Sequence, residues 1–196
     1  MTDLRSAELW TAFRGGNLEA LAVLFEAHYA ALFGYGLKLT GDEELVKDSI
    51  QQLFQKLLQR PGQVAEVQLV KAYFFTALRR HLGDETKRRQ RSSSLLKTYA
   101  DPFEVTYSHE EFLIAQQTDA AQQARLMSAL NRLSKRQREA LYLKFFDGFS
   151  YEHIAEVMAL NTQSVRNLVF NALKALRSSM LVSLALLCLL GSQVGL

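Results

Sequence analysis

The chain has 196 residues, 48% of them hydrophobic, which suits one medium domain or two small ones with well-filled cores. A net charge of +3 and a pI near 9.0 favour a polyanionic partner. The single cysteine, Cys188, excludes an internal disulfide, and the four histidines have no ligand-like spacing, so no metal or other cofactor is expected.

Apolar residues recur at helical spacing through the first part of the chain. They predict helices over residues 6–13, 18–39, 42–59 and 68–81. With two prolines, ten glycines and no alternating β-branched run, the sequence is typical of an all-α protein. Gly34 and Gly36 interrupt the second of these helices and indicate a bend or close packing. The chain begins without a charged-then-apolar signal segment, which favours a cytoplasmic location.

The helix expected over 42–59 has a clear buried stripe and a polar outer face. Its stripe consists of Val46, Ile50, Leu53, Phe54 and Leu57. The outer face carries Lys47, Asp48, Gln51, Gln52, Gln55 and Lys56. Such a face is either solvated surface or a docking surface for another protein.

Aromatic and basic residues are concentrated in and after the fourth helix. The successive rings Tyr73, Phe74 and Phe75 cannot all point into one core at about 100° per residue, so at least one lies at a rim. Cations follow at Arg79, Arg80, Lys87, Arg88, Arg89 and Arg91. Rings beside cations can bind single strands, because bases stack on rings while cations follow phosphates. Two core aromatics before a solvated basic helix end would give the same pattern.

An acidic connection separates this half from the second. Residues 100–119 hold five acids and no Lys or Arg, which favours an extended linker. At the other end of the chain, Met180–Leu190 is apolar but too short for a membrane helix of about 20 residues. We therefore expect no stable membrane insertion, and we interpret this tail as an extension of the last helix that packs against the protein or a partner.

The second half ends in the pattern of a helix-turn-helix. A helix is expected from about residue 121, a second after the capping box at Ser134, a third after Ser150 and a fourth after Asn161. One face of the last helix is apolar. Its opposite face carries Gln163, Ser164, Arg166, Asn167, Phe170, Asn171 and Lys174. Amides and guanidinium groups read base edges in the major groove, so we expect this helix to enter DNA.

Two blocks of sequence resemble the extracytoplasmic-function class of bacterial RNA polymerase sigma factors. The first is DEELVKDSIQQLFQKLLQ followed by KAYFFTALRRHLGDETKRR, and the second is LSKRQREALYLKFFDGFSYEHIAEVMALNTQSVRNLVFNALKALR. Within it, LNTQSVRNL is especially similar to the iron-citrate-regulator-like subgroup. The resemblance implies an all-α protein of two small helical domains, 1–98 and 121–179, joined by an acidic linker, 99–120, and followed by the apolar tail, 180–196.

The resemblance also implies a function, that of a promoter-specificity subunit with no catalytic activity of its own, serving a stress- or nutrient-responsive regulon. Core RNA polymerase would dock on Asp48, Gln51, Gln52 and Gln55. The melted promoter element would contact Tyr73, Phe74, Arg79, Arg80, Lys87, Arg88 and Arg89. The helix-turn-helix would read duplex promoter DNA, and an anti-sigma factor would cover both DNA-binding domains.

Some positions depart from the family pattern. Ala159 stands where Gly is usual in the turn, at a cost of about 1 kcal/mol if its φ is positive. His153 replaces a usual Glu, and Phe170 with Asn171 replaces a usual polar or basic pair.

Three other functions are compatible with parts of the sequence. A conventional two-domain helix-turn-helix transcription regulator would bind duplex DNA without polymerase. A nucleic-acid enzyme would need a metal cluster or paired carboxylates, which the sequence does not offer. A membrane-tethered module would use the apolar tail. In the free chain, the acidic linker could also fold back onto the basic stretch 79–91 or the helix over 134–144.

Overall fold

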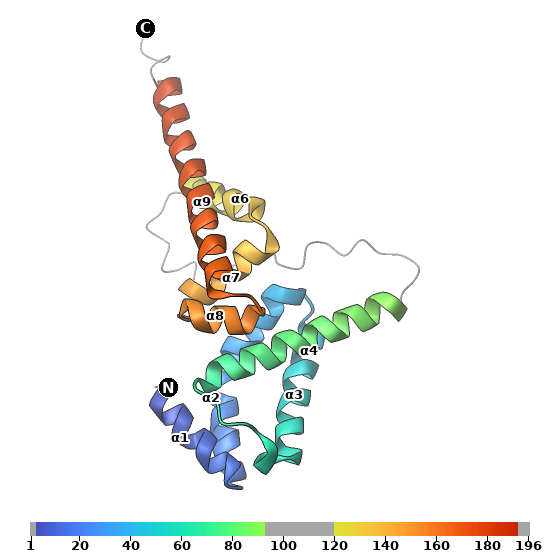
Figure 1. Cartoon of the computed structure of the whole chain (residues 1–196). Helices are drawn as coiled ribbons and strands as arrows, with labels where there is room; N and C mark the ends of the chain where they lie inside the picture. Colours follow the sequence, from blue (N-terminus) through green and yellow to red (C-terminus); the bar gives the residue numbers. More distant parts are fainter. Residues whose placement is uncertain (1–2, 93–119, 192–196) are drawn as a thin grey trace.

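The structure is a computed structural model that describes residues 3–92 and 120–191, with side chains described over 3–89 and 126–178. As expected, these residues form helices, and no strand occurs among them. The first half comprises α1 (Asp3–Arg14), α2 (Leu18–Thr40), α3 (Glu43–Gln59), the 3-10 turn η1 (Pro61–Gln63) and α4 (Val70–Ser92). The second half comprises α6 (Ala120–Arg132), α7 (Lys135–Phe145), α8 (Tyr151–Met158) and α9 (Thr162–Gly191) (Figure 1).

The central helix of the first half is α2, which packs against α1, α3 and α4. Near the α1 end of this core, the Trp10 ring contacts the rings of Tyr73 and Phe74 at centroid distances of 5.1 and 5.7 Å. Its indole N–H donates a hydrogen bond to the Ala65 carbonyl at 3.1 Å, which holds the segment before α4 against α1. By length and hydropathy α2 could span a membrane, but the core helix of a soluble protein passes the same test.

Local signals in the sequence correspond to the observed helix starts. The side chains of Asn17, Asp42 and Ser150 accept hydrogen bonds from backbone N–H groups in the first turns of α2, α3 and α8. Ser134 and Gln137 form the expected capping box of α7. All five residues of the stripe predicted for α3 are buried.

Two helices are longer than the sequence pattern predicts. Residue 81 was the expected end of α4, yet the helix continues to Ser92 and carries the basic residues of 87–91 with it. A single Gly83 costs a helix only about 1 kcal/mol, and the ion pair of Glu85 with Arg88 favours the extension. Likewise α9 continues to Gly191, so the tail extends the last helix as expected. The side chains of this tail, and so their packing partners, lie outside the described residues. The acidic linker lies outside them as well.

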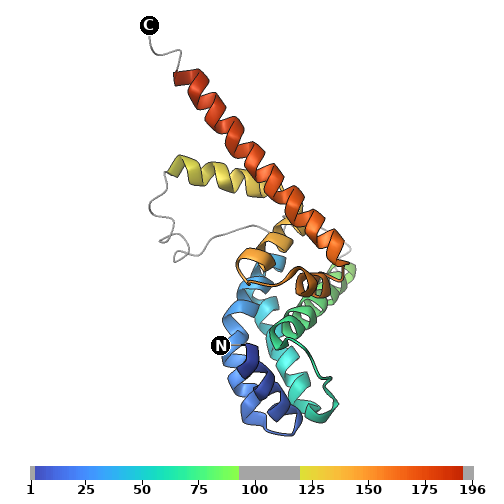
Figure 2. The same cartoon turned by 60° about the vertical axis from the view of Figure 1, so that its left-hand side comes forward.

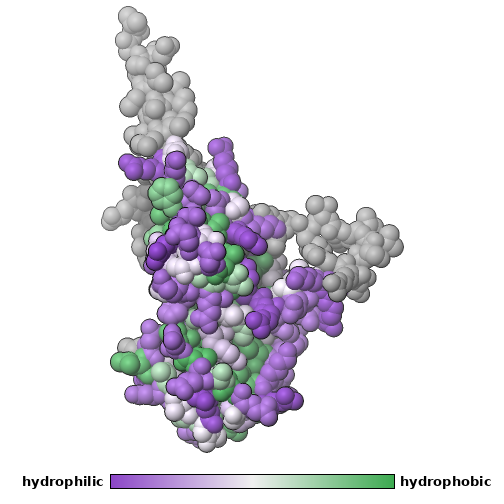
Figure 3. Space-filling view, in the orientation of Figure 1, coloured by the Kyte–Doolittle hydropathy of each residue, from purple (hydrophilic) through white to green (hydrophobic). Residues whose placement is uncertain are grey.

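The two halves are in contact. α8 packs across α4, and α9 projects away from the first half in both views (Figures 1 and 2). The outer end of α4 is covered by hydrophilic side chains (Figure 3).

Candidate nucleic-acid interface

The helix-turn-helix presents the predicted face of α9 to solvent. Val165, Val169 and Ala172 are buried against α6, α7 and α8. The opposite side chains are exposed, apart from the half-buried Ser164: Gln163, Arg166, Asn167, Phe170, Asn171 and Lys174. The helix starts at a capped turn, because the Asn161 side chain accepts from the Ser164 N–H at 2.7 Å. An exposed face of amides and cations on such a helix can enter a major groove.

Neighbouring side chains orient part of this face. The Gln163 amide donates to the Asn167 side-chain oxygen at 3.0 Å. The Arg166 guanidinium lies 5.7 Å from the Tyr151 ring and 3.4 Å from the Glu152 carboxylate. Hydrogen bonds from its own backbone N–H and from Ser150 lower the pKa of Glu152, so this carboxylate stays ionised beside Arg166. Both partners are exposed, so the ion pair is weak and Arg166 can exchange it for a base or phosphate.

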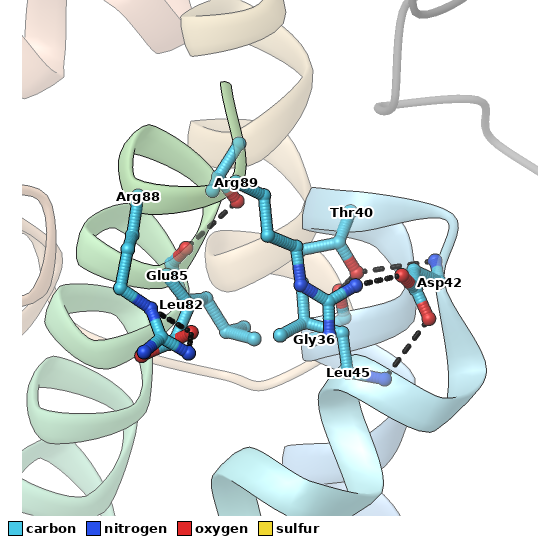
Figure 4. A network of polar contacts seen from close by, with 9 residues as sticks. Gly36, Thr40, Asp42, Leu45, Leu82, Glu85, Arg88 and Arg89 are labelled. Atoms are coloured by element: carbon cyan, nitrogen blue, oxygen red, sulfur yellow. Dashed lines mark hydrogen bonds and ion pairs between the residues drawn. The ribbon is translucent and has the colours of Figure 1, made fainter. Parts of the chain in front are cut away.

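A second cationic face lies along α4. Arg80, Lys87 and Arg88 form this face and are exposed, and the exposed Arg89 lies on the side of the helix opposite Arg80. Arg89 bonds Asp42, the cap of α3, at 2.8 Å, while Arg88 pairs with Glu85 within α4 (Figure 4). These contacts hold two of the guanidinium groups at fixed positions on the outer end of α4.

A groove of about 440 Å³ with a mixed polar and apolar lining lies beside this face, between α3 and α4. It is lined by the half-buried Tyr73 ring together with Lys56, Thr76, Arg80, His81 and Asp84. Burial lowers the pKa of His81, and the charge of Lys56 lowers it further, so His81 is uncharged at neutral pH. A ring, two cations and a neutral imidazole can accept a nucleotide base and its phosphate at the part of the groove away from the Asp84 carboxylate.

Two of the predicted strand-contacting residues are placed differently. Phe74 is completely buried and packs on Phe54 and His28, so it has no surface for a base, and its predicted role is not supported. Three consecutive rings cannot share one face, and here Tyr73 lies at the rim while Phe74 and Phe75 lie inside. Arg79 is half-buried and pairs with Glu139 of α7.

The predicted polymerase-docking residues lie together on α3. Asp48, Gln51, Gln52 and Gln55 are all exposed. Next to them, a groove of about 490 Å³ runs between α2 and α3, lined mainly by apolar residues such as Phe25, Phe54 and Leu58. A polar rim beside an apolar groove is a composition that suits protein docking.

Sequence reasoning missed the residues that join the two halves. The carboxylate of Glu139 accepts hydrogen bonds from the Tyr35 hydroxyl at 2.8 Å and from Arg79 Nε at 2.7 Å. Lys71 of α4 pairs with Asp147, which follows α7, at 3.1 Å. Each of these charges alone resembles a solvated surface charge, so the sequence carried no signal of their pairing. In the described part of the chain, no group of His, Cys, Asp and Glu side chains could hold a metal ion.

Comparisons with known proteins agree with this geometry. Residues 123–176, which contain the helix-turn-helix, match the family described as Sigma-70, region 4. The chain is 24% identical over 158 residues to the ECF RNA polymerase sigma factor SigL of Mycobacterium tuberculosis, covering 80% of this chain and 86% of that protein. It is 25% identical over 174 residues to the ECF sigma factor BldN of Streptomyces coelicolor, covering 88% of this chain and 64% of BldN.

Solved structures show the same fold. CnrH, in complex with the cytosolic domain of CnrY, aligns with a TM-score of 0.61 at 20% identity, covering 91% of this chain and 98% of CnrH. RpoE of Bartonella quintana, in complex with the anti-sigma factor NepR, aligns with a TM-score of 0.57 at 22% identity, covering 82% of this chain and 96% of RpoE. The chain is therefore similar in sequence to sigma factors of the extracytoplasmic-function class, and the solved structures show that it shares a sigma-factor fold.

Proposed function

We propose that this sigma factor docks on core RNA polymerase through the outer face of α3, captures the melted promoter strand with α4, and reads a duplex promoter element with α9. Residues 1–98 and 121–179 act as its two functional domains. It works in the cytoplasm beside the polymerase and contributes no catalysis of its own.

One observation carries this proposal: the chain presents two separate cationic faces, on two helices whose neighbouring residues differ in chemistry. The α9 face has exposed amides and cations but no acid, and a capped turn holds it. The α4 face has cations beside a groove with an aromatic wall. The first is suited to base edges in duplex DNA, and the second to bases and phosphates of an opened strand.

Two finer assignments rest on likeness. The LNTQSVRNL segment supports membership of the iron-citrate-regulator-like subgroup and a nutrient-responsive regulon. The structural relatives CnrH and RpoE are seen with CnrY and an anti-sigma factor, which supports an anti-sigma partner for this chain as well.

Run-off transcription with core polymerase and promoters from the chain's own genome tests the proposal. The wild-type chain should stimulate promoter-dependent transcripts. Asp48→Arg should abolish stimulation together with core binding, since it reverses a charge on the docking face. Glu8→Arg, the same reversal at an exposed position on α1, should leave both unchanged. Duplex binding without any binding to core polymerase would contradict the proposal and favour a conventional regulator.

A further inference from the structure

The groove between α2 and α3 is a long channel, which we call the α2–α3 groove. It is lined from Leu18 to Tyr29 along α2 and from Lys47 to Leu58 along α3. The two helices are antiparallel neighbours, so Leu18 and Leu58 lie at one end of the channel and Tyr29 and Lys47 at the other (Figure 1). Each lined stretch covers three helical turns, so the channel is about 16 Å long.

The surface of the α2–α3 groove is almost free of charge. Ile50 lies on its floor and is completely buried, whereas the large apolar side chains at its rim are exposed, Leu18 by 51% and Leu58 by 46%. Of the described residues that line the groove, Lys47 alone is charged, and it pairs with Glu43 one turn earlier on α3. Such a channel between two helices suits a third helix that is apolar and uncharged.

The chain carries a helix of this kind at its other end. Residues 180–190 read MLVSLALLCLL, and residues 178–196 contain no charged residue. Because α9 continues to Gly191, residues 180–190 are helical. At the rise of an α-helix these residues also span about 16 Å, the length of the α2–α3 groove.

The apolar tail leaves the core of its own chain. Of the described side chains of α9, Ala172 is the last that is buried, and those from Leu173 to Ser178 are exposed or half-buried. In both views the end of α9 projects past the other described helices, while the first turns of α2, which line the groove, lie at the opposite end of the molecule (Figures 1 and 2). In this arrangement a chain cannot place its tail in its own groove, but a second copy can.

Pairing of two copies satisfies both apolar surfaces at once. A projecting apolar helix and an open apolar groove each favour association in water. The tail has no counterpart for the charges of the groove between α3 and α4, which is lined by Lys56, Arg80 and Asp84, among others. Two copies related by a two-fold axis can make the tail-to-groove contact twice, so that the assembly closes at two chains.

We propose that the free chain forms a closed pair, in which the apolar tail of each copy lies in the α2–α3 groove of the other. The pair also covers part of the polymerase-docking face, because Gln51 and Gln55 line the same groove. A second copy and core polymerase therefore compete for this side of α3. The competition rests on the proposed function, whereas the pairing does not.

Light scattering of the full chain after size-exclusion chromatography tests the pairing. Leu58→Glu puts a charge on the groove rim, and Leu184→Glu puts one in the tail. Leu4→Glu is the matched control, since Leu4 is an exposed leucine of α1 away from the groove. Wild type and Leu4→Glu should have the mass of two chains. Each of the other two variants should raise the dissociation constant of the pair about tenfold or more, because the contact would bury a charge without a partner.

Disulfide formation locates the tail, because Cys188 is the single cysteine of the chain and lies within the tail. Leu58→Cys and Lys47→Cys, each in a Cys188→Ser background, place a thiol at one end of the groove or the other. After mixing with wild type and oxidation, at least one of them should give a linked pair with one copy of each chain. Leu4→Cys in the same background should not. Wild type alone should form little linked pair, because its two Cys188 thiols lie in separate grooves.

Three results would overturn the pairing. The first is a wild-type chain that remains a monomer as its concentration is raised. The second is linkage of Cys188 to Leu4→Cys as efficient as its linkage to the groove positions. The third is a pair that Leu184→Glu dissociates and Leu58→Glu does not, together with ready linkage of Cys188 to Cys188. In that case the tails would bind each other rather than the grooves.

Binding to core polymerase tests the competition separately. Core polymerase should split the wild-type pair, and the disulfide-linked pair should bind core only after reduction. Equal core binding before and after reduction would show that the two partners do not compete. If neither wild type nor the monomeric Leu184→Glu binds core polymerase, the proposed function is wrong, and the pairing is still decided by the mass and the disulfides.

Discussion

Gly36 of α2 and Val46 of α3 touch so closely that no methyl group fits between them: a Cβ at Gly36 would lie 2.7 Å from Val46 Cγ1. Gly36→Ala should therefore lower the free energy of unfolding by about 1–3 kcal/mol, as overpacking of a core does. Urea denaturation followed by circular dichroism measures the loss.

For a second helical glycine, Gly83, we predict a change in the free energy of unfolding of the opposite sign. Gly83 also lies inside a helix, but no atom lies within 4 Å of a Cβ placed there. Gly83→Ala should stabilise the chain by about 0.5–1 kcal/mol, because Ala loses less backbone entropy in a helix. Adding Val46→Ala to Gly36→Ala should recover part of the lost stability. Equal effects of the two glycine substitutions would contradict the close α2–α3 contact.

The structure shows whether Ala159, in the turn between α8 and α9, has the positive φ that would make an alanine costly there. Its φ of 52° and ψ of 51° place it in the left-handed region, where it ends α8. Ala159→Gly should raise the free energy of unfolding by about 1 kcal/mol, since glycine adopts this conformation without the steric cost of a Cβ. Ala175→Gly, at an exposed position inside α9, should lower it instead. Thermal denaturation of both variants checks the sign, and a destabilising Ala159→Gly would show that the turn is not strained.

The helices were predictable from this sequence because the signals for each one, its apolar spacing and its capping residue, lie within or next to the helix itself. The stripe of α3 recurs at every turn, and the caps at Asp42, Ser134 and Ser150 precede their helices directly. The contact between the halves was not predictable, because Arg79 and Glu139 are 60 residues apart and each resembles a surface charge. For the same reason the sequence grouped Arg79 with the exposed cations of α4. The ambiguity at Phe74 arose because spacing alone cannot decide which of three adjacent rings lies at the rim.

The buried His28 makes stability depend on pH. Burial lowers its pKa below the ordinary 6.5, and the charge of Lys71 lowers it further. Its Nε2 is buried without a hydrogen-bond partner. A histidine with a lowered folded pKa stabilises the fold fully above its unfolded pKa, and that contribution is lost as pH falls through the folded value.

Unfolding by urea at about pH 7.5 and pH 5.5 should show this loss, at up to about 1.4 kcal/mol per pH unit from one histidine. Both His28→Gln and His28→Phe should reduce the slope, although their absolute stabilities will differ. Asp147 changes stability with pH in the opposite direction, because burial raises its pKa against the attraction of Lys71. Its contribution is the same in the wild type and in both His28 variants, so it cancels when their slopes are compared. An unchanged slope in both variants would show that His28 does not titrate as a buried group.

Removal of Arg166 and removal of Lys174 from α9 should change DNA binding in different ways. We propose that Arg166, which Tyr151 and Glu152 orient, contacts a base edge, whereas Lys174 lies two turns further along the same face. Arg166→Ala should cost about 1–3 kcal/mol on the preferred promoter and relax the preference at one base pair. Lys174→Ala should weaken binding to all sequences and reduce the slope of log affinity against log salt by about 0.9. Binding of full-length holoenzyme to a panel of duplex variants at several salt concentrations measures both effects.

Glu152→Gln completes this comparison, because it removes the anion beside Arg166 without touching the cation. It should strengthen binding to every sequence and leave the base preference intact, since the acid competes with DNA for the guanidinium. If Arg166→Ala instead weakened binding equally on every variant, Arg166 would be a phosphate contact, and base reading on α9 would have to come from Gln163, Asn167 and Asn171.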